Sequence, residues 1–371
     1  MGDEFNGVSV RPVIAQAGVR ATRSASASAS DFTELAARIQ RAGLMRRRYG
    51  YYWAKLVLLP LAIVVACVAF VWIGDTWWQL ISAVVFGVLF TQVAFLGHDA
   101  AHRQIFVSGR WNDWTSLIIG DLFIGMSYGW WRHKHTRHHA NPNKIDVDPD
   151  IDLPVISFTP EQARAPRSPF AQWLVAHQGI FFFPILLLEG LSLHASGIRR
   201  VTSREKLERR WVEIGFLTLR LAGFVTLVFL VLSPGTAFVF LAVQLGIFGV
   251  YMGMVFAPNH KGMPLVPKDA KLDFLTRQVL MSRNVRGTRA LDVVMGGLNY
   301  QIEHHLFPSM PRPHLRHVAP MVQTYCVSHG VPYTVTGLLE SYGIVIRYIN
   351  RVGLGERDPF ACPLVEQRRA I

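Results

Sequence analysis

Residues 131–143 read Trp-Arg-His-Lys-His-Thr-Arg-His-His-Ala-Asn-Pro-Asn, and the rest of the chain can be interpreted around this stretch because it holds four histidines within seven residues. On a helix, His135 lies on the same face as His138 and His139, which follow it by three and four residues. Three imidazoles on one face can converge on one point, which is a spacing typical of metal ligands. A metal ion needs further ligands, so other histidines are expected to reach the same place.

Two further clusters of histidines support this interpretation. His98 and His102 form an i,i+4 pair in His-Asp-Ala-Ala-His, and His304 and His305 are adjacent in the sequence Gln-Ile-Glu-His-His that begins at Gln301. One such pair alone also fits a solvated helix face or a hydrogen-bonded core position. The three clusters together hold seven of the fourteen histidines of the chain. We therefore interpret them as ligands of a metal centre.

The composition predicts a membrane protein. Hydrophobic residues make up 51% of the 371 residues, and the mean hydropathy is +0.25. The formal net charge is +13, but the basic residues flank apolar runs, as in cytoplasmic loops, which argues against a nucleic-acid partner. The three cysteines, Cys67, Cys326 and Cys362, have no short spacing, which excludes a disulfide framework and a four-cysteine iron–sulfur cluster. A metal would therefore be held by nitrogen.

Four stretches are long and apolar enough to cross a bilayer. Each has 21 residues, roughly 31 Å as a helix, against a hydrocarbon core of about 30 Å. Short connections, Gly-Asp-Thr and Ser-Pro-Gly, join them into two antiparallel hairpins with tips on the same side. Neither tip carries Lys or Arg, so we expect the tips to point away from the cytoplasm and both termini to be cytoplasmic. The predicted spans are 53–73, 77–97, 212–232 and 236–256, with a helical cytoplasmic cap over 98–211 and 257–371.

Two other apolar stretches, 117–131 and 173–193, are interrupted by charged residues such as Asp121 and Glu189. If the first one crossed the membrane, the histidines on its two sides could not share a metal ion. We therefore predict that both stretches form helices that lie in the membrane interface or pack against the bundle.

The amino-terminal residues differ in composition from the rest. Residues 1–30 are polar and end in a Ser-Ala tract, so we predict a disordered tail. A helix is expected to begin at Asp31, which has the pattern of a capping box with Glu34. Residues 31–371 are expected to form a single domain of all-α integral-membrane fold.

This topology places the three histidine clusters on one side of the membrane. His260 follows the fourth predicted span directly, at the same depth as His98, so we add it as an eighth candidate ligand. Eight imidazoles exceed the four ligands of one tetrahedral zinc ion and suit two metal ions with four or more ligands each. Zinc, copper, iron and nickel all accept imidazole, so ligand type alone does not choose the metal.

The three clusters, with the Ala-Asn-Pro-Asn that follows the second and the Leu-Phe-Pro-Ser-Met-Pro-Arg that follows the third, closely resemble the histidine boxes of the integral-membrane fatty acid desaturases. The third box has Gln301 where many relatives have His, and in this it resembles the branch of front-end and bacterial acyl-lipid or acyl-CoA desaturases. The resemblance covers roughly residues 35–345.

The resemblance implies a non-haem di-iron centre that uses O₂ and two electrons to introduce a cis double bond into a long-chain acyl group. The iron ligands that it implies are His98, His102, His135, His138, His139, His304 and His305, with His260 as the eighth. Gln301 is expected either to bind iron weakly or to orient a neighbour, and Asp99 either to hydrogen-bond a ligand histidine or to be solvated. Asn259 is expected to support the site with them. The acidic run at Asp146, Asp148, Asp150 and Asp152 is expected to cap a loop or support the histidines.

The partners follow from the same resemblance. The sequence contains neither a His-Pro-Gly-Gly haem motif nor a GxGxxG dinucleotide motif, so electrons are expected from a separate protein, such as a ferredoxin or cytochrome b5 with its reductase. The acyl carrier stays open between CoA and a phospholipid. We expect a bacterial plasma membrane, with the endoplasmic reticulum as the alternative location. A membrane hydroxylase of lipids, carotenoids or alkanes is the alternative function.

Overall fold

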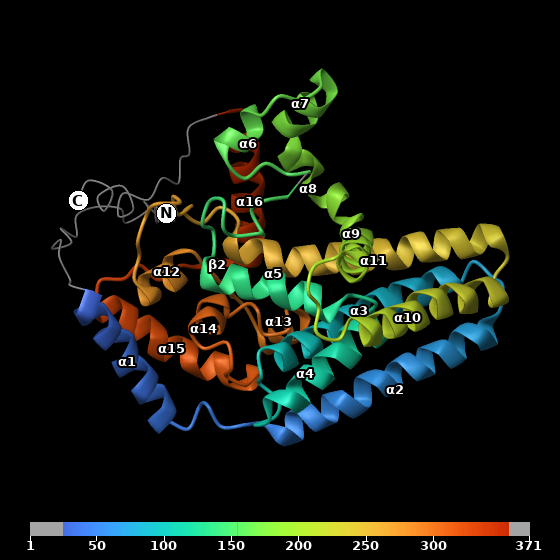
Figure 1. Ribbon diagram of the computed structural model, residues 1–371, viewed down its shortest axis with the longest axis horizontal. Helices are drawn as coiled ribbons and strands as arrows, with labels where there is room; N and C mark the ends of the chain where they lie inside the picture. Colours follow the sequence, from blue (N-terminus) through green and yellow to red (C-terminus); the bar gives the residue numbers. More distant parts are fainter. Residues whose placement is uncertain (1–24, 154, 356–371) are drawn as a thin grey trace, which may run out of the picture.

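The computed structural model describes residues 25–153 and 155–355, with side chains from residue 32 on. Four long helices lie side by side, and shorter helices cover one end of this bundle (Figure 1). The long helices are α2 (Tyr49–Ile73), α3 (Gln79–Ala101), α10 (Arg210–Val231) and α11 (Pro234–His260). All four are long and apolar enough to cross a membrane, which confirms the predicted all-α membrane fold.

The two predicted hairpins are present. Residues 74–78 connect α2 to α3, residues 232 and 233 connect α10 to α11, and both connections lie at the end of the bundle away from the cap (Figure 1). α3 and α11 each continue four residues beyond the predicted span. His98 and His260 therefore sit on the cap ends of transmembrane helices, in rigid backbone.

α3 and α11 form the centre of the bundle. Gly87 of α3 lets them approach closely, because a Cβ atom there would lie 2.7 Å from the side chain of Ile247. Buried phenylalanines fill the space between the helices, and the ring of Phe70 on α2 lies 5.0 Å from that of Phe240 on α11. The rest of α2 is largely exposed and presents apolar side chains to the surrounding lipid.

The prediction of one helix over 117–131 is wrong. This stretch is divided among the end of α4 (Gly109–Leu117), a π-helix η1 (Ile118–Ile124) and the start of α5 (Tyr128–Ala140). The break falls at Gly125, whose φ of 86° is left-handed and suits glycine. The buried carboxylate of Asp121 accepts a hydrogen bond from the backbone N–H of Tyr128 (3.1 Å) and so fixes the turn. η1 packs against α3 and α10, as expected for a segment lying on the bundle.

The stretch 173–193 is also divided. It runs through α7 (Pro169–Ala176), α8 (Gln178–Leu186) and the start of α9 (Glu189–Thr202). α8 and α9 are bent by 69°, and together they are apolar enough to count as a fifth, broken span. The bend lies directly against α11, because a Cβ atom on Gly249 would be 2.4 Å from the carbonyl oxygen of Leu186. The predicted single helix is therefore wrong, although its packing against the bundle is observed.

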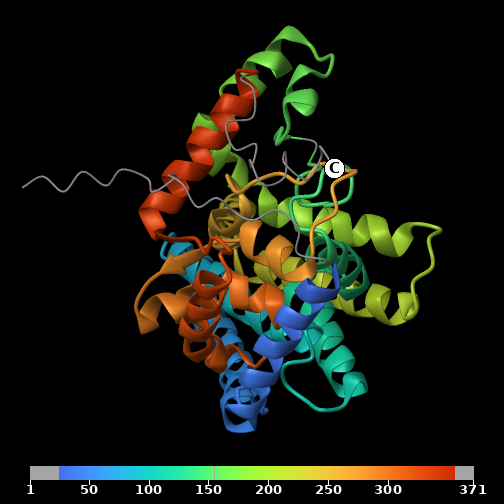
Figure 2. The same cartoon turned by 90° about the vertical axis from the view of Figure 1, so that its left-hand side faces the viewer.

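The cap consists of short helices and one small sheet. α16 packs against α6, α7 and α8, on the side of the cap away from α1 and α15 (Figures 1 and 2). The two strands pair in parallel, with Val285 opposite Thr336. The remaining elements are α1 (Ala25–Arg41), α6 (Pro160–Arg164), α12 (Phe274–Leu280), β1 (Asn284–Arg286), α13 (Arg289–Val294), α14 (Gln301–Leu306), α15 (Arg312–Ser328), β2 (Val335–Gly337) and α16 (Leu338–Gly353).

α1 begins earlier than predicted. The helix starts at Ala25, so residues 25–30 are helical and do not belong to a disordered tail, and the capping box at Asp31 is not the start of the helix. Alanine has the highest helix propensity and alternates with serine in this tract. Leu35 and Ile39 of α1 are buried in the cap core. The rest of the predicted tail, residues 1–24, lies outside the described residues.

Candidate metal centre

All eight candidate histidines meet where the cap joins the bundle. His98 lies in the last turn of α3, and His102 caps that helix. His135, His138 and His139 lie on α5, His260 ends α11, and His304 and His305 lie on α14. α3 belongs to the first membrane hairpin, α11 to the second, and α5 and α14 to the cap. The fold therefore brings the histidines together from both hairpins and from the cap.

Four of the histidines form one group, which consists of His98, His102, His135 and His304. Their nearest ring nitrogens all lie within 4.8 Å of one another. The Nε2 atoms of His102 and His135 are 2.8 Å apart, and the rings of His98 and His304 have centroids 4.8 Å apart.

His138, His260 and His305 form a second group. The Nε2 atoms of His138 and His260 are 3.3 Å apart. His139 lies between the two groups. Its Nε2 atom is 3.0 Å from that of His135 and 3.1 Å from that of His304, and its ring stacks on His305 at a centroid distance of 4.1 Å.

The ring nitrogens that face away from the second group have fixed hydrogen-bond partners. Nδ1 of His138 donates to the carboxylate of Asp148, with both oxygens at 3.0 Å. Nδ1 of His260 donates to the backbone carbonyl of Met281 (2.9 Å), and Nδ1 of His305 to the side-chain oxygen of Gln278 (3.0 Å). Each hydrogen bond sets the tautomer that leaves Nε2 unprotonated and directed into the site, which is how proteins orient metal-binding imidazoles.

The geometry fits metal ions. Two nitrogens bound to one ion at 2.0–2.1 Å lie roughly 2.8–3.0 Å apart at octahedral angles and roughly 3.3–3.4 Å apart at tetrahedral angles, and the closest pairs here are 2.8–3.3 Å apart. Nε2 of His98 and Nε2 of His305 are buried and have no hydrogen-bond partner among the described residues. Buried polar atoms without a partner are costly, and a bound cation would satisfy both.

The histidines outside the membrane spans are mostly held neutral. Burial lowers the pKa of His102, His135, His139, His304 and His305 well below the usual value, and neighbouring imidazoles lower each pKa further. A neutral imidazole has the lone pair that a metal ion requires. Burial also lowers the pKa of His138, but the carboxylates of Asp148 and Asp150 outweigh it and leave that pKa raised.

The three polar residues predicted to support the site have different surroundings. Asp99 does not hydrogen-bond His98, because the two side chains are 3.8 Å apart; it pairs instead with buried Arg312 of α15 at 2.7 Å. The amide nitrogen of Gln301 lies 2.9 Å from Nε2 of His260, at the edge of the second group. The side-chain amide of Asn259 donates to the side-chain oxygen of Gln301 (3.3 Å). Asn259 is therefore linked to His260 only through Gln301 among the described hydrogen bonds.

Sequence reasoning missed some of the supporting residues. Gln278 and the carbonyl of Met281 lie on or beside α12, in a segment without any recognisable motif. Trp131 lies in the quoted stretch, and its ring stacks on that of His135 at a centroid distance of 4.3 Å. Within the acidic run, the structure singles out Asp148, which is 1% exposed and contacts His138.

A narrow apolar cavity borders the first group at His98. Its walls are built mainly from α3, η1, α5 and α11, and they include Phe95, Gly120, Tyr128, Trp131 and Phe256. Its volume of about 20 Å³ is close to the minimum for one water molecule. A hydrocarbon chain would enter only after these side chains rotate away.

Fold and site together define a multi-pass membrane protein with a buried cluster of histidines able to hold metal ions. A family model described as fatty acid desaturase matches residues 75–337. This chain is 34% identical to the acyl-lipid (9-3)-desaturase of Physcomitrium patens, over 87% of this chain and 62% of that relative, or just under two thirds of its length. The chain belongs to the fatty acid desaturase family, whose members are oxidoreductases.

Other relatives carry similar names. The Delta(8)-fatty-acid desaturase of Helianthus annuus is 25% identical, over 88% of this chain and 74% of that protein. The Delta(6)-fatty-acid desaturase of Caenorhabditis elegans is 28% identical, over 86% and 74%. These matches confirm the family that the three histidine boxes indicated, and they do not favour the hydroxylase alternative.

Proposed function

We propose that this protein is a membrane acyl desaturase that converts –CH₂–CH₂– in a long-chain acyl group to a cis –CH=CH–. O₂, two electrons and two protons are consumed, and two molecules of water are released. The convergence of eight histidines, five of them buried and three half-buried, beside an apolar cavity supports this activity most directly. The family membership and the names of the relatives agree with it.

We propose that two non-haem iron ions bind the histidines. His98, His102, His135 and His304 would hold one ion, and His138, His260 and His305 the other. His139 lies within reach of both, and Gln301 lies beside the second group. When bound, iron supplies the oxidising power to remove hydrogen from an unactivated methylene, which no side-chain base can do.

The protein's own contribution is to position the substrate and exclude water. The cavity beside His98 has apolar walls, and the ring of Trp131 forms a continuous surface from this cavity to His135. A methylene held there would face the first group of histidines in a dry environment, which favours reaction at one carbon and protects the protein from oxidation.

The same reaction site could in principle add oxygen and produce an alcohol. The relatives described above are named desaturases, so we do not favour this outcome. The product masses distinguish the two, because desaturation removes two hydrogens and hydroxylation adds one oxygen.

We further propose that the cap, the histidines and both termini face the cytoplasm, in a bacterial plasma membrane or, alternatively, the endoplasmic reticulum. The absence of Lys and Arg from both hairpin tips supports this orientation. The excess of basic residues would attract an acidic electron carrier such as a ferredoxin or cytochrome b5 with its reductase.

The test is expression in a host that lacks the activity, followed by profiling of cellular fatty acids and location of any new double bond. We expect a new unsaturated product from the wild type and none from His138→Ala or His304→Ala. His317→Ala is the matched control, because His317 is exposed on α15, outside the histidine groups, and should retain the product. The metal content of each purified protein provides a second measurement. Full activity in either ligand variant would refute the assignment.

A further inference from the structure

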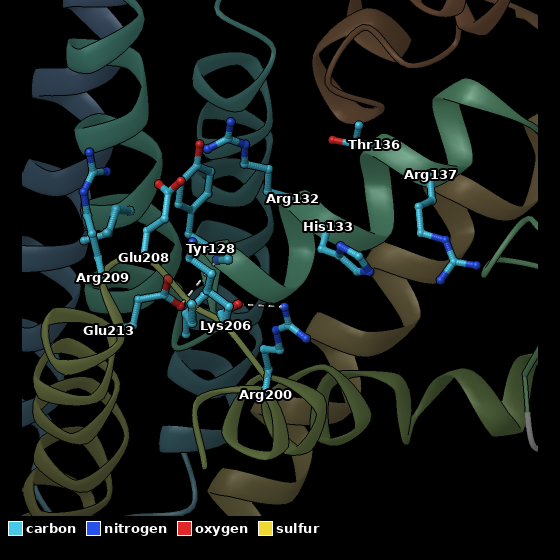
Figure 3. Close-up of a pocket in the computed structure, with 13 residues that line it drawn as sticks. Tyr128, Arg132, His133, Thr136, Arg137, Arg200, Lys206, Glu208, Arg209 and Glu213 are labelled. Carbon is cyan, nitrogen blue, oxygen red and sulfur yellow. Dashed lines mark hydrogen bonds between the residues drawn. The ribbon is translucent and has the colours of Figure 1, made fainter. Parts of the chain in front are cut away.

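Arg283 has surroundings unlike those of most arginines of the cap. Arg132 and Arg137, for example, are exposed and line a polar pocket of about 350 Å³ beside α5 (Figure 3). Arg283 directly precedes β1 and is 1% exposed. Buried Arg312 pairs with Asp99, whereas Arg283 forms no ion pair with a carboxylate among the described residues. Its N–H groups therefore need acceptors of another kind.

The last turn of α11 lacks part of the usual helical hydrogen bonding. Pro258 has no N–H, so the carbonyl of Met254, four residues earlier, cannot receive the usual hydrogen bond from this position. The hydroxyl of Tyr342 on α16 donates to that carbonyl instead (2.8 Å). His260 is the last residue of α11 and follows Pro258 by two positions. The backbone that carries this candidate ligand therefore depends on contacts from outside the helix.

Arg283 supplies most of these outside contacts. The last carbonyls of a helix have no partner within the helix. Nε of Arg283 donates to the carbonyl of Pro258, and Nη2 donates to that of Lys261 (2.7 Å). The backbone N–H of Arg283 donates to the carbonyl of Asn259 (2.9 Å). One residue thus holds three of the four carbonyls from 258 to 261.

The segment that contains Arg283 also orients the ring of His260. Nδ1 of His260 donates to the backbone carbonyl of Met281, two residues before Arg283 (2.9 Å). This hydrogen bond leaves Nε2 of His260 directed at Nε2 of His138, 3.3 Å away. The remaining carbonyl, that of His260, accepts from the side-chain amide of Asn143 (3.1 Å). A shift of residues 281–283 would therefore move the backbone and the ring of His260 together.

The positive charge of Arg283 suits the end of a long helix. The carboxyl end of a helix carries roughly half a negative elementary charge, and α11 reaches this point after 27 residues. Burial lowers the pKa of Arg283 to about 10, so the guanidinium stays protonated at neutral pH. A buried cation without a carboxylate is costly, and an apolar side chain would fill the space without that cost. The carbonyls of α11 are therefore the physical reason for a guanidinium here.

We propose that Arg283 is a positioning residue that holds His260 in the second histidine group, with His138 and His305. This inference rests on the proposed two-iron centre and deepens it, because it makes the binding of one ion depend on a residue outside the histidine boxes. Loss of Arg283 frees the last turn of α11 and lets His260 move away from His138. The ion in the second group then binds more weakly, and the ion in the first group is unaffected.

The experiment measures iron content per chain of the purified full-length protein in detergent, over a series of buffered free Fe²⁺ concentrations. Two backgrounds isolate the groups, because His98→Ala impairs the first and His305→Ala impairs the second. In the His98→Ala background, Arg283→Met should raise the midpoint of iron binding about 10- to 100-fold, as expected when a metal-binding histidine loses its support. In the His305→Ala background, the same substitution should leave the midpoint unchanged.

Two further variants complete the test. Arg283→Lys keeps the charge but lacks the fork of nitrogens that reaches Pro258 and Lys261 at once, so its midpoint should lie between those of the wild-type residue and Met. Arg286→Met is the matched control, because Arg286 lies three residues later on β1, is exposed and should leave both midpoints unchanged. Thermal unfolding without metal shows whether each variant folds. If Arg283→Met does not fold, the comparison of the two backgrounds is made with Arg283→Lys, which should raise only the second-group midpoint.

The outcomes separate this inference from the proposed function. An unchanged midpoint in the His98→Ala background overturns the positioning role of Arg283. Equal shifts in both backgrounds also overturn it, because they indicate a general loss of stability. A wild type that binds two iron ions while either result is obtained keeps the proposed metal centre and rejects only the role of Arg283. A folded wild type that binds no iron rejects the proposed centre itself.

Discussion

Replacing Asp148 by Asn should weaken metal binding without changing the shape of the site. Asp148 is buried, and both of its oxygens lie 3.0 Å from Nδ1 of His138. The same carboxylate accepts from the backbone N–H groups of Asn143 (2.7 Å) and Asp150 (2.9 Å). Asparagine has nearly the same volume and keeps one oxygen, but it loses the negative charge that polarises His138 and places an amide where an acceptor is needed.

The size of the effect follows from this role. Residues that orient a metal-binding histidine typically contribute 10- to 100-fold in metal affinity, which corresponds to about 1.4–2.7 kcal/mol. Asp146→Asn is the matched control in the same acidic run, because Asp146 is exposed and pairs with Lys268 at 3.4 Å, away from the histidines. It should change metal affinity less than about twofold, since an exposed ion pair away from the centre contributes little.

The assay is metal content per chain, measured over a series of buffered free iron concentrations. The midpoint for Asp148→Asn should lie 10- to 100-fold higher than for the wild type, and the midpoint for Asp146→Asn should not move. Thermal unfolding of each protein without metal separates a loss of metal affinity from a loss of folding. A folded Asp148→Asn protein that binds iron as tightly as the wild type would refute the orienting role of this carboxylate.

Three further predictions concern the framework around the site. Arg312→Ala should destabilise the protein by about 3–5 kcal/mol, because it leaves Asp99 buried without a partner; Arg316→Ala, which breaks a more exposed pair with Asp292, should cost at most about 1 kcal/mol in the same unfolding assay. Gly249→Ala should cost about 1–3 kcal/mol by pushing the α8–α9 bend off α11, whereas Gly235→Ala adds a methyl group to open space and should leave the melting temperature nearly unchanged. Burial and the neighbouring Glu213 raise the pKa of Asp121 to about 9, so its contribution to stability is full below its ordinary pKa and declines as the pH rises toward 9. Between pH 6 and pH 8, the free energy of unfolding of the wild type should therefore fall by up to about 1.4 kcal/mol per pH unit relative to that of Asp121→Asn. Melting temperatures of the two proteins that change equally with pH over that range would contradict this.

The sequence predicted the parts of the fold that depend on local patterns. The four spans follow from uninterrupted apolar stretches, and the meeting of the histidines follows from a topology in which all clusters lie on one side of the membrane. The break at Gly125 and the bend before Glu189 were missed for a different reason. Each depends on contacts with distant segments, such as the close approach of Gly249 to Leu186, that leave no periodic trace in the sequence.

In the candidate site, too, local sequence patterns could be predicted and contacts between distant residues could not. The histidines could be named because they occur in dense clusters with helical spacing. The role of Asp99 could not be predicted, because its partner Arg312 lies more than two hundred residues away. Gln278 could not be singled out among the other amides of the chain, since only the folded structure brings it to His305.

Because the hairpin connections are short, nearly all of the described chain outside the long helices lies at one end of the bundle (Figure 1). Beyond residues 74–78 and the two residues between α10 and α11, almost nothing of the described chain outside the helices lies at the far end of the bundle (Figure 1). A protease or a membrane-impermeant label applied to that surface of a sealed vesicle would find two small turns and little else. Under the proposed function, iron, reductant and acyl chains would all reach the site from the compartment that the cap faces or from within the lipid, and their supply in the other compartment would have no effect on the reaction.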